Sequence, residues 1–289
     1  MTANARDIAF TRYDGRRGID WLRESYRMFS RHRLGWVGML AGYYIALLVV
    51  DVVPFIGVFI APVLKPVLSV GFLAAAWTQE RGGKPALRML LRGFGANLAA
   101  LLPLGIIFVS GISIAIGATA LIDGGQLLEM LYGAAPAADA DPTGAARSVQ
   151  DTLASTRVQL AMLFGALCAL PTILALWWAP ALVVFQDAPL LAALGASLRA
   201  AIANWRAALR YALGVFTLGA VVPTLVTTGI ALVVPPPLNA TIAALIVLPY
   251  LAFFVSTLHI ADYVSYRDVF HAGETLAPIG GGDARAPAP

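Results

Sequence analysis

Residues 98–122 read LAALLPLGIIFVSGISIAIGATALI and contain no charged side chain. A helix rises about 1.5 Å per residue, so about 20 apolar residues are enough to cross a hydrocarbon core about 30 Å thick. This stretch therefore predicts a transmembrane helix. Five further apolar runs of similar length can be drawn along the chain, at about 34–53, 54–78, 158–185, 211–234 and 240–261.

The composition favours a membrane protein over a soluble one. Hydrophobic residues make up 59% of the 289-residue chain and charged residues only 12%, with a mean hydropathy of +0.78. The surface of a soluble protein of this size would need far more charge. The sequence therefore predicts an all-α, polytopic transmembrane helix bundle, with six spans arranged as three hairpins.

The basic residues are distributed unevenly between the spans. Most of the 20 Lys and Arg residues fall in 1–33, 79–97, 186–210 and the C-terminal tail, whereas the opposite gaps hold only Arg147 and Arg157. Because basic loops stay on the cytoplasmic side of a membrane, both termini are predicted to be cytoplasmic. Helical spans with this bias indicate a multipass protein of a bacterial inner membrane.

Three regions outside the spans are predicted from composition. Residues 1–15 are expected to be a flexible cytoplasmic N-terminus, ahead of a transmembrane domain over 16–270. The extracytoplasmic loop 123–157 contains an Ala-, Asp- and Pro-rich stretch typical of a linker. The tail 271–289, rich in Gly, Ala and Pro, is expected to be disordered.

Each hairpin is predicted to follow an amphipathic helix on the cytoplasmic face, near 16–33, 84–95 and 189–206. In the first of these, Leu22, Tyr26 and Phe29 recur at helical spacing among arginines, which is typical of a helix in the headgroup layer. We expect membrane lipids, including anionic headgroups, to contact the basic residues of these segments: Arg16, Arg17, Arg23, Arg27, Arg88, Arg92, Arg199 and Arg206.

The net charge of +4 does not indicate nucleic-acid binding, because the basic residues flank apolar spans, where they attract anionic lipid. The single cysteine, Cys168, lies in an apolar run. One cysteine cannot build a disulfide framework or a cysteine-based metal site. We therefore expect no nucleic-acid partner, no metal and no cofactor.

Lys65 is the most unusual residue inside a span. If the second span begins near residue 54, Lys65 lies roughly 16 Å deep, where a lysine costs about 2.5–3.5 kcal/mol. One interpretation is a buried polar site in which the ammonium pairs with Asp51, or with backbone carbonyls left without donors by Pro62 and Pro66. The other is a side chain that extends towards the outer interface.

A second polar cluster ends the sixth span. His259, Asp262, Tyr263 and Tyr266 are spaced three to four residues apart along one helix face. A histidine and an aspartate on one face can relay protons or bind a cation. The cluster is nevertheless close to the predicted cytoplasmic end, where tyrosines and charged residues form an ordinary interfacial belt, and the belt is the favoured interpretation.

Three segments resemble a proteobacterial family of uncharacterised six-span membrane proteins. They are WWAPALVVF at 177–185, NWRA at 204–207 and YVSYRDVF at 263–270. The chain is similar, more distantly, to the membrane domain attached to some glycerophosphodiester phosphodiesterases. The resemblance covers most of 16–270 and implies the six-span fold, but it brings no agreed activity and no catalytic residues.

No catalytic motif is visible, so we expect no enzyme activity. The leading hypothesis is a non-catalytic membrane module that organises lipid or a complex with a membrane-protein partner. The alternative is a transporter or channel for a small solute, with a site near Lys65. A lipid-processing enzyme has the least support.

Overall fold

The computed structural model describes residues 8–53, 57–133 and 142–272. Within these ranges the chain is helical and forms no strand. Six helical stretches are long and apolar enough to span a bilayer, which confirms the all-α polytopic class and the number of spans. They are Arg33–Asp51, Ile60–Glu80, Leu98–Asp123, Thr156–Gln186, Trp205–Val233 and Leu238–Phe270.

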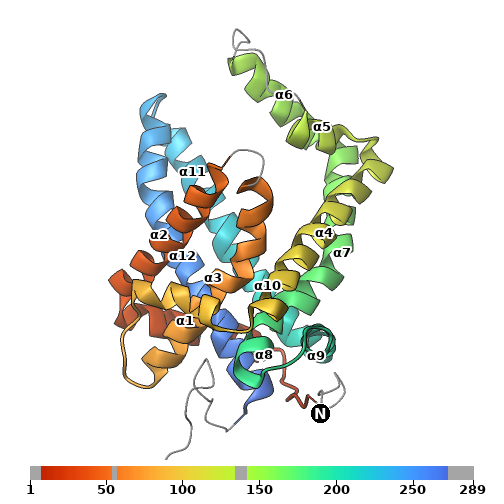
Figure 1. The fold of residues 1–289 in the computed structure, drawn as a ribbon. Coiled ribbons are helices and arrows are strands. Elements are labelled where there is room, and N and C mark those ends of the chain that lie inside the picture. Colours follow the sequence, from red (N-terminus) through yellow and green to blue (C-terminus); the bar gives the residue numbers. More distant parts are fainter. Residues whose placement is uncertain (1–7, 54–56, 134–141, 273–289) are drawn as a thin grey trace, which may run out of the picture. The chain divides into compact units, whose positions relative to one another are not determined.

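The chain forms two compact units, one made of residues 1–105 and 175–289 and the other of 106–174. The larger unit carries the polar sites described below, and Figure 1 labels most of its helices. Its helices are α1 (Arg17–Arg31), α2 (Arg33–Asp51), α3 (Gly57–Glu80), the 3₁₀ helix η2 (Leu87–Gly95), the first part of α4 (Leu98–Asp123), α8 (Ala179–Gln186), α9 (Leu190–Ala203), α10 (Trp205–Phe216), the π-helix η3 (Thr217–Val221), α11 (Val222–Val233) and α12 (Leu238–Phe270).

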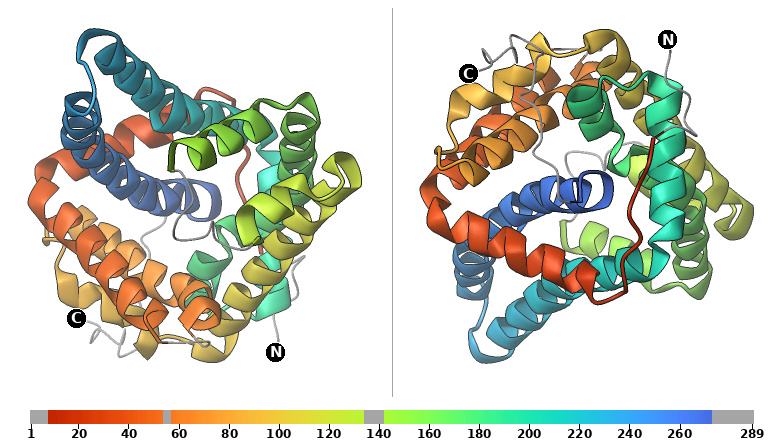
Figure 2. Two further views of the ribbon diagram at one scale, coloured as in Figure 1. Left: turned by 90° about the horizontal axis from the view of Figure 1, so that it is seen from above. Right: turned by 90° about the horizontal axis from the view of Figure 1, so that it is seen from below.

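Helix α12 organises the larger unit. It packs against α1, α2 and α3, and Figure 2 shows it in blue alongside the red-to-orange α1 and α2. Ile260, Tyr263 and Tyr266 are fully buried in its second half. In its first half α12 pairs with α11 instead, and Leu245 and Leu248 are exposed there. The packed core of this unit therefore lies around the C-terminal half of α12.

Helix α1 forms where the first amphipathic segment is predicted, but its apolar face contacts protein. Trp21 and Phe29 are buried, and α1 packs against α10 and α12. The approach to α10 is so close that a Cβ at Gly18 would lie 2.1 Å from the carbonyl oxygen of Ala207. Neighbouring helices therefore cover the apolar face of α1, whereas its placement in the headgroup layer stays a prediction.

The other two amphipathic segments are also helical. The second is the 3₁₀ helix η2 rather than an α-helix, and the third is α9. The fourth span is interrupted at Trp178, between α7 (Thr156–Trp177) and α8. Pro180 lies in the first turn of α8, where a residue without an N–H is tolerated because the first-turn donors have no partner within the helix.

The smaller unit contains the rest of α4, α5 (Gln126–Tyr132), α6 (Pro142–Ala154) and most of α7. A Cβ at Gly111 would lie 2.4 Å from Oγ1 of Thr172, so glycine allows α4 and α7 to approach closely here. The predicted loop 123–157 is partly helical, because it contains α5 and α6. Residues 134–141 of its linker-like stretch lie outside the described ranges.

The described part of the N-terminus is held by hydrogen bonds, although the sequence predicts flexibility over 1–15. The amide of Thr11 donates to the Val269 carbonyl at 2.7 Å. The amide of Tyr13 donates to Oδ1 of Asn204 at 2.8 Å, and Nδ2 of Asn204 donates to the Thr11 carbonyl at 3.0 Å. Residues 8–14 thus join the start of α10 to the end of α12. Residues 1–7 and the tail 273–289 lie outside the described ranges.

Candidate functional site

A small cavity lies where α3, the α7–α8 break and α12 meet. Its volume is about 30 Å³, and since a water needs about 10–15 Å³ by this measure, it has room for one or two water molecules. The lining residues come from all three of these parts of the chain: Ser69, Leu73, Trp177, Pro180, Ala181, His259 and Asp262.

Aromatic packing and hydrogen bonds fix the polar walls of this cavity. The His259 ring stacks on Phe72 with centroids 4.0 Å apart, and the edge of Tyr43 meets it at 5.7 Å. The Trp177 side chain hydrogen-bonds to the Asp262 carboxyl group. The Ser69 hydroxyl donates to the Pro66 carbonyl at 2.8 Å, which leaves its oxygen as a further acceptor in the wall.

The structure divides the four-residue cluster predicted at the end of the sixth span. His259 and Asp262 share the cavity. Tyr263 instead donates a hydrogen bond to Glu80 on α3. The Tyr266 hydroxyl lies 2.8 Å from Nε2 of His271. The i, i+3 pair therefore forms one site, whereas the two tyrosines contact other partners.

An ionic network closes the end of the helix beyond this cavity. The Asp268 carboxylate is buried and accepts hydrogen bonds from Nε of Arg17 at 2.5 Å and Nε1 of Trp21 at 3.0 Å. Arg267 contacts Glu24 at 2.6 Å and also pairs with Glu80. The network joins α1, α3 and α12. Arg17, which is predicted to contact lipid headgroups, is thus paired within the protein.

The segments that carry the family resemblance meet around this network. The buried Trp178 indole donates to Oγ of Ser265 at 2.9 Å, so the WWAPALVVF and YVSYRDVF segments are in direct contact. Asn204 of NWRA holds Tyr13, whose hydroxyl donates to the Asp268 carbonyl at 3.1 Å. Burial and then the Asp268 charge raise the pKa of Tyr13, which keeps this phenol protonated. The three segments therefore build one packed core.

Lys65 and Asp51 do not line the cavity, and both side chains are exposed. Both interpretations of Lys65, the buried polar site and the side chain extended to the interface, stay predictions. Lys65 lies one turn before Ser69 on α3, so the two share a helix face. Ser69 and Trp177 were missed from the sequence. The four-residue spacing from Lys65 to Ser69, which places both residues on one face of α3, is a signal that could have led to Ser69.

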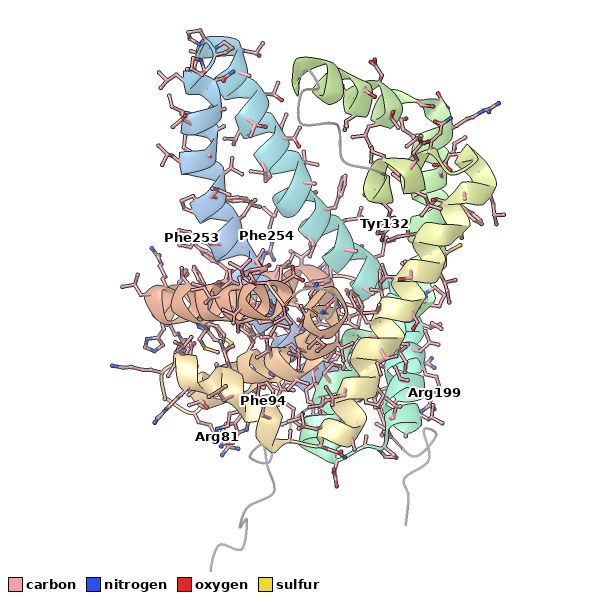
Figure 3. The ribbon with its side chains drawn as sticks, turned by 45° about the horizontal axis from the view of Figure 1, so that its top comes forward. Arg81, Phe94, Tyr132, Arg199, Phe253 and Phe254 are labelled. Carbon is pink, nitrogen blue, oxygen red and sulfur yellow. The ribbon has the colours of Figure 1, made fainter. Side chains whose placement is uncertain are left out.

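The segment η2 combines exposed apolar and basic side chains. Leu87, Leu91 and Phe94 are 57%, 65% and 44% exposed, and Arg88 and Arg92 beside them are exposed as well. Figure 3 labels Phe94 on η2. It also labels Arg81, which is exposed in the turn that follows α3. The result is an outward surface on which apolar and positive groups alternate.

The opposite face of η2 is fixed to α3. Leu90 and Gly93 are buried. A Cβ at Gly93 would lie 1.8 Å from the Val67 carbonyl oxygen, and one at Gly71 would lie 2.4 Å from the Leu90 Cα. Because the two backbones touch through these glycines, η2 is held at a defined orientation on α3.

The remaining predicted headgroup residues vary in exposure. Arg16, Arg23, Arg27 and Arg206 are exposed. Arg23 pairs with Asp20 at 3.2 Å. Arg199, labelled in Figure 3, is half-buried, and its Nη2 atom has no hydrogen-bond partner among the described residues.

Comparison with known proteins shows the family to which the chain belongs. No family model matches it, and no solved structure matches it. It is 30% identical over 273 residues to a probable inner membrane protein of Burkholderia thailandensis, with 90% of this chain and 93% of the relative covered. The likeness to the membrane domain of glycerophosphodiester phosphodiesterases stays a prediction. The chain is a multipass membrane protein and belongs to the family of this probable inner membrane protein.

Proposed function

We propose that the protein is a non-catalytic membrane module that organises anionic lipid, or a partner complex assembled on it, at the predicted cytoplasmic face. The observation that carries the proposal is the outward surface of η2. Its apolar side chains Leu87, Leu91 and Phe94 are suited to the acyl boundary, and the guanidinium groups of Arg88 and Arg92 are suited to anionic headgroups.

The fixed position of η2 supports this function. Glycine contacts hold its inner face on α3, so its outer side chains are presented without the cost of ordering a mobile segment. The apolar face of α1, by contrast, is occupied by α10 and α12. Of the first two amphipathic segments, η2 is therefore the better candidate for lipid contact.

The alternative, a small-solute transporter with a site near Lys65, has less support. The cavity that Ser69 lines, one helical turn from Lys65, has room for one or two waters, and Lys65 does not line it. Lys65→Leu in a flux assay would still test this alternative directly.

The test is native mass spectrometry of the full chain purified in mild detergent and then exposed to phosphatidylglycerol. We expect bound lipid in the wild type and a large loss in Arg88→Ala/Arg92→Ala. Each basic residue near an anionic surface contributes about 1 kcal/mol, so removing two should weaken binding roughly thirtyfold. The matched control is Arg31→Ala/Arg33→Ala, which removes equal charge from two exposed positions where α1 meets α2, outside the residues predicted to contact headgroups.

An equal loss in the two double variants would contradict a specific role for η2, because it would reflect net charge alone. Unchanged binding in Arg88→Ala/Arg92→Ala would reject the lipid site. A protein partner retained in stoichiometric amount by the wild type and lost with this double variant would support the partner-complex form of the proposal.

A further inference from the structure

The cavity between α3, the α7–α8 break and α12 has a composition that packing alone does not require. Leu73, Pro180 and Ala181 supply apolar walls, whereas His259 and Asp262 bring two ionisable groups into the same space. Ionisable side chains within spans are costly and face protein or water, so their presence together indicates a polar ligand. The volume of about 30 Å³ restricts that ligand to the size of water.

Few other charges face this pair. Among the described lining residues none is Lys or Arg. Tyr43 of α2 contacts the His259 ring, and Tyr211 of α10 lies near Asp262. Both are phenols that are neutral at physiological pH. The nearest cationic residue in sequence on α3 is Lys65, one turn from Ser69 and exposed.

Charge balance then couples the two residues. With one titratable proton the pair is neutral overall, either as imidazole with carboxylic acid or as imidazolium with carboxylate. Adding a second proton or removing the first leaves a net charge in a site with little compensation. Because both groups line one small cavity, we expect them to titrate as a pair rather than independently.

We propose that His259 and Asp262 form a proton-binding site in which one proton is shared through water held beside Ser69 and Trp177. The proton leaves one residue as it joins the other, so the exchange within the cavity is balanced. This inference goes beyond the lipid function of η2 and does not depend on it.

The test is histidine-selective ¹⁵N labelling of the full chain in detergent, followed by NMR between about pH 4 and pH 9. The chain has only three histidines, and His32 and His271 serve as internal references. Because coupled sites report each other's protonation, His259 should titrate in two steps. A single-step curve for wild-type His259 would overturn the proposal, and this result needs no variant.

Asp262→Asn should reduce the His259 curve to one step and lower the affinity for its proton at least about tenfold, because the compensating carboxylate is gone. The matched control is Asp187→Asn, an exposed aspartate at the end of α8, which should leave both steps in place. An unchanged His259 curve in Asp262→Asn would contradict a shared proton. A shift of the wild-type curve when Na⁺ replaces K⁺ would assign the site to a metal cation instead.

Discussion

Nε of Arg17 lies 2.5 Å from Oδ2 of Asp268, although 251 residues separate them in sequence. The contact ties the first helix of the chain to the end of the last one. Asp268 is 7% exposed and also accepts a hydrogen bond from the buried Trp21 indole. Removing one partner of a buried pair leaves the other charge without compensation, which makes this contact a sensitive point of the fold.

We expect Asp268→Asn to destabilise the protein by about 3 kcal/mol, because the Arg17 guanidinium would lose the closer of its two anionic partners and keep only Glu24, at 3.3 Å. The value is at the low end for buried pairs, since Arg17 is 31% exposed. Unfolding in mixed micelles measures the change. The control is Asp20→Asn, which breaks the exposed pair with Arg23 and should cost less than about 1 kcal/mol. Equal losses in the two variants would show that the Asp268 contact has no special weight.

Asn204 gives a second prediction, because its side chain holds the N-terminal segment. It is buried and bonds to the backbone of both Thr11 and Tyr13. Asn204→Ala leaves these groups without partners, at a cost of about 1–3 kcal/mol. Hydrogen–deuterium exchange should become faster across residues 8–14. Asn239→Ala, at the start of α12, is the control and should leave exchange in 8–14 unchanged.

The spans and their number could be predicted from the sequence because hydropathy and length decide them. The 98–122 run, for example, coincides with α4 to within a residue. Which neighbour covers an amphipathic face is a different question. The pattern around Leu22 and Phe29 fits lipid and protein equally well, and tertiary contacts with α10 and α12 decide between them.

The candidate site could likewise be predicted only in part from the sequence. The helical spacing of His259 and Asp262 places them on one face, and the structure brings them to one cavity. The same spacing includes Tyr263, whose hydroxyl is directed to Glu80 by the packing of α3. Ser69 and Trp177 line the cavity only because three separate parts of the chain meet there. The spacing of residues within one helix does not predict such a meeting.

Gly93 provides a third prediction, about the attachment of η2. A methyl group there would meet the Val67 carbonyl oxygen at 1.8 Å, so Gly93→Ala must displace η2 from α3. We expect a loss of about 1–3 kcal/mol and faster hydrogen exchange over 87–95. Gly95→Ala is a matched control in the same segment, because a Cβ at Gly95 has no neighbour within 4 Å. Similar exchange in the two variants would indicate that the glycine contact does not hold η2 in place.

The orientation in the membrane gives the fourth prediction, and the single Cys168 makes it simple to test. In a Cys168→Ser background, single cysteines would replace Leu91 on η2 and Tyr132 on α5, which are 65% and 71% exposed. Because basic segments stay on the cytoplasmic side, Tyr132→Cys should react with an impermeant thiol reagent in intact cells. Leu91→Cys should react only after the inner membrane is permeabilised. Because the two side chains are similarly exposed in the structure, local burial does not explain a difference in labelling. The reverse labelling pattern would place both termini outside, and it would also move the lipid surface of η2 to the opposite leaflet.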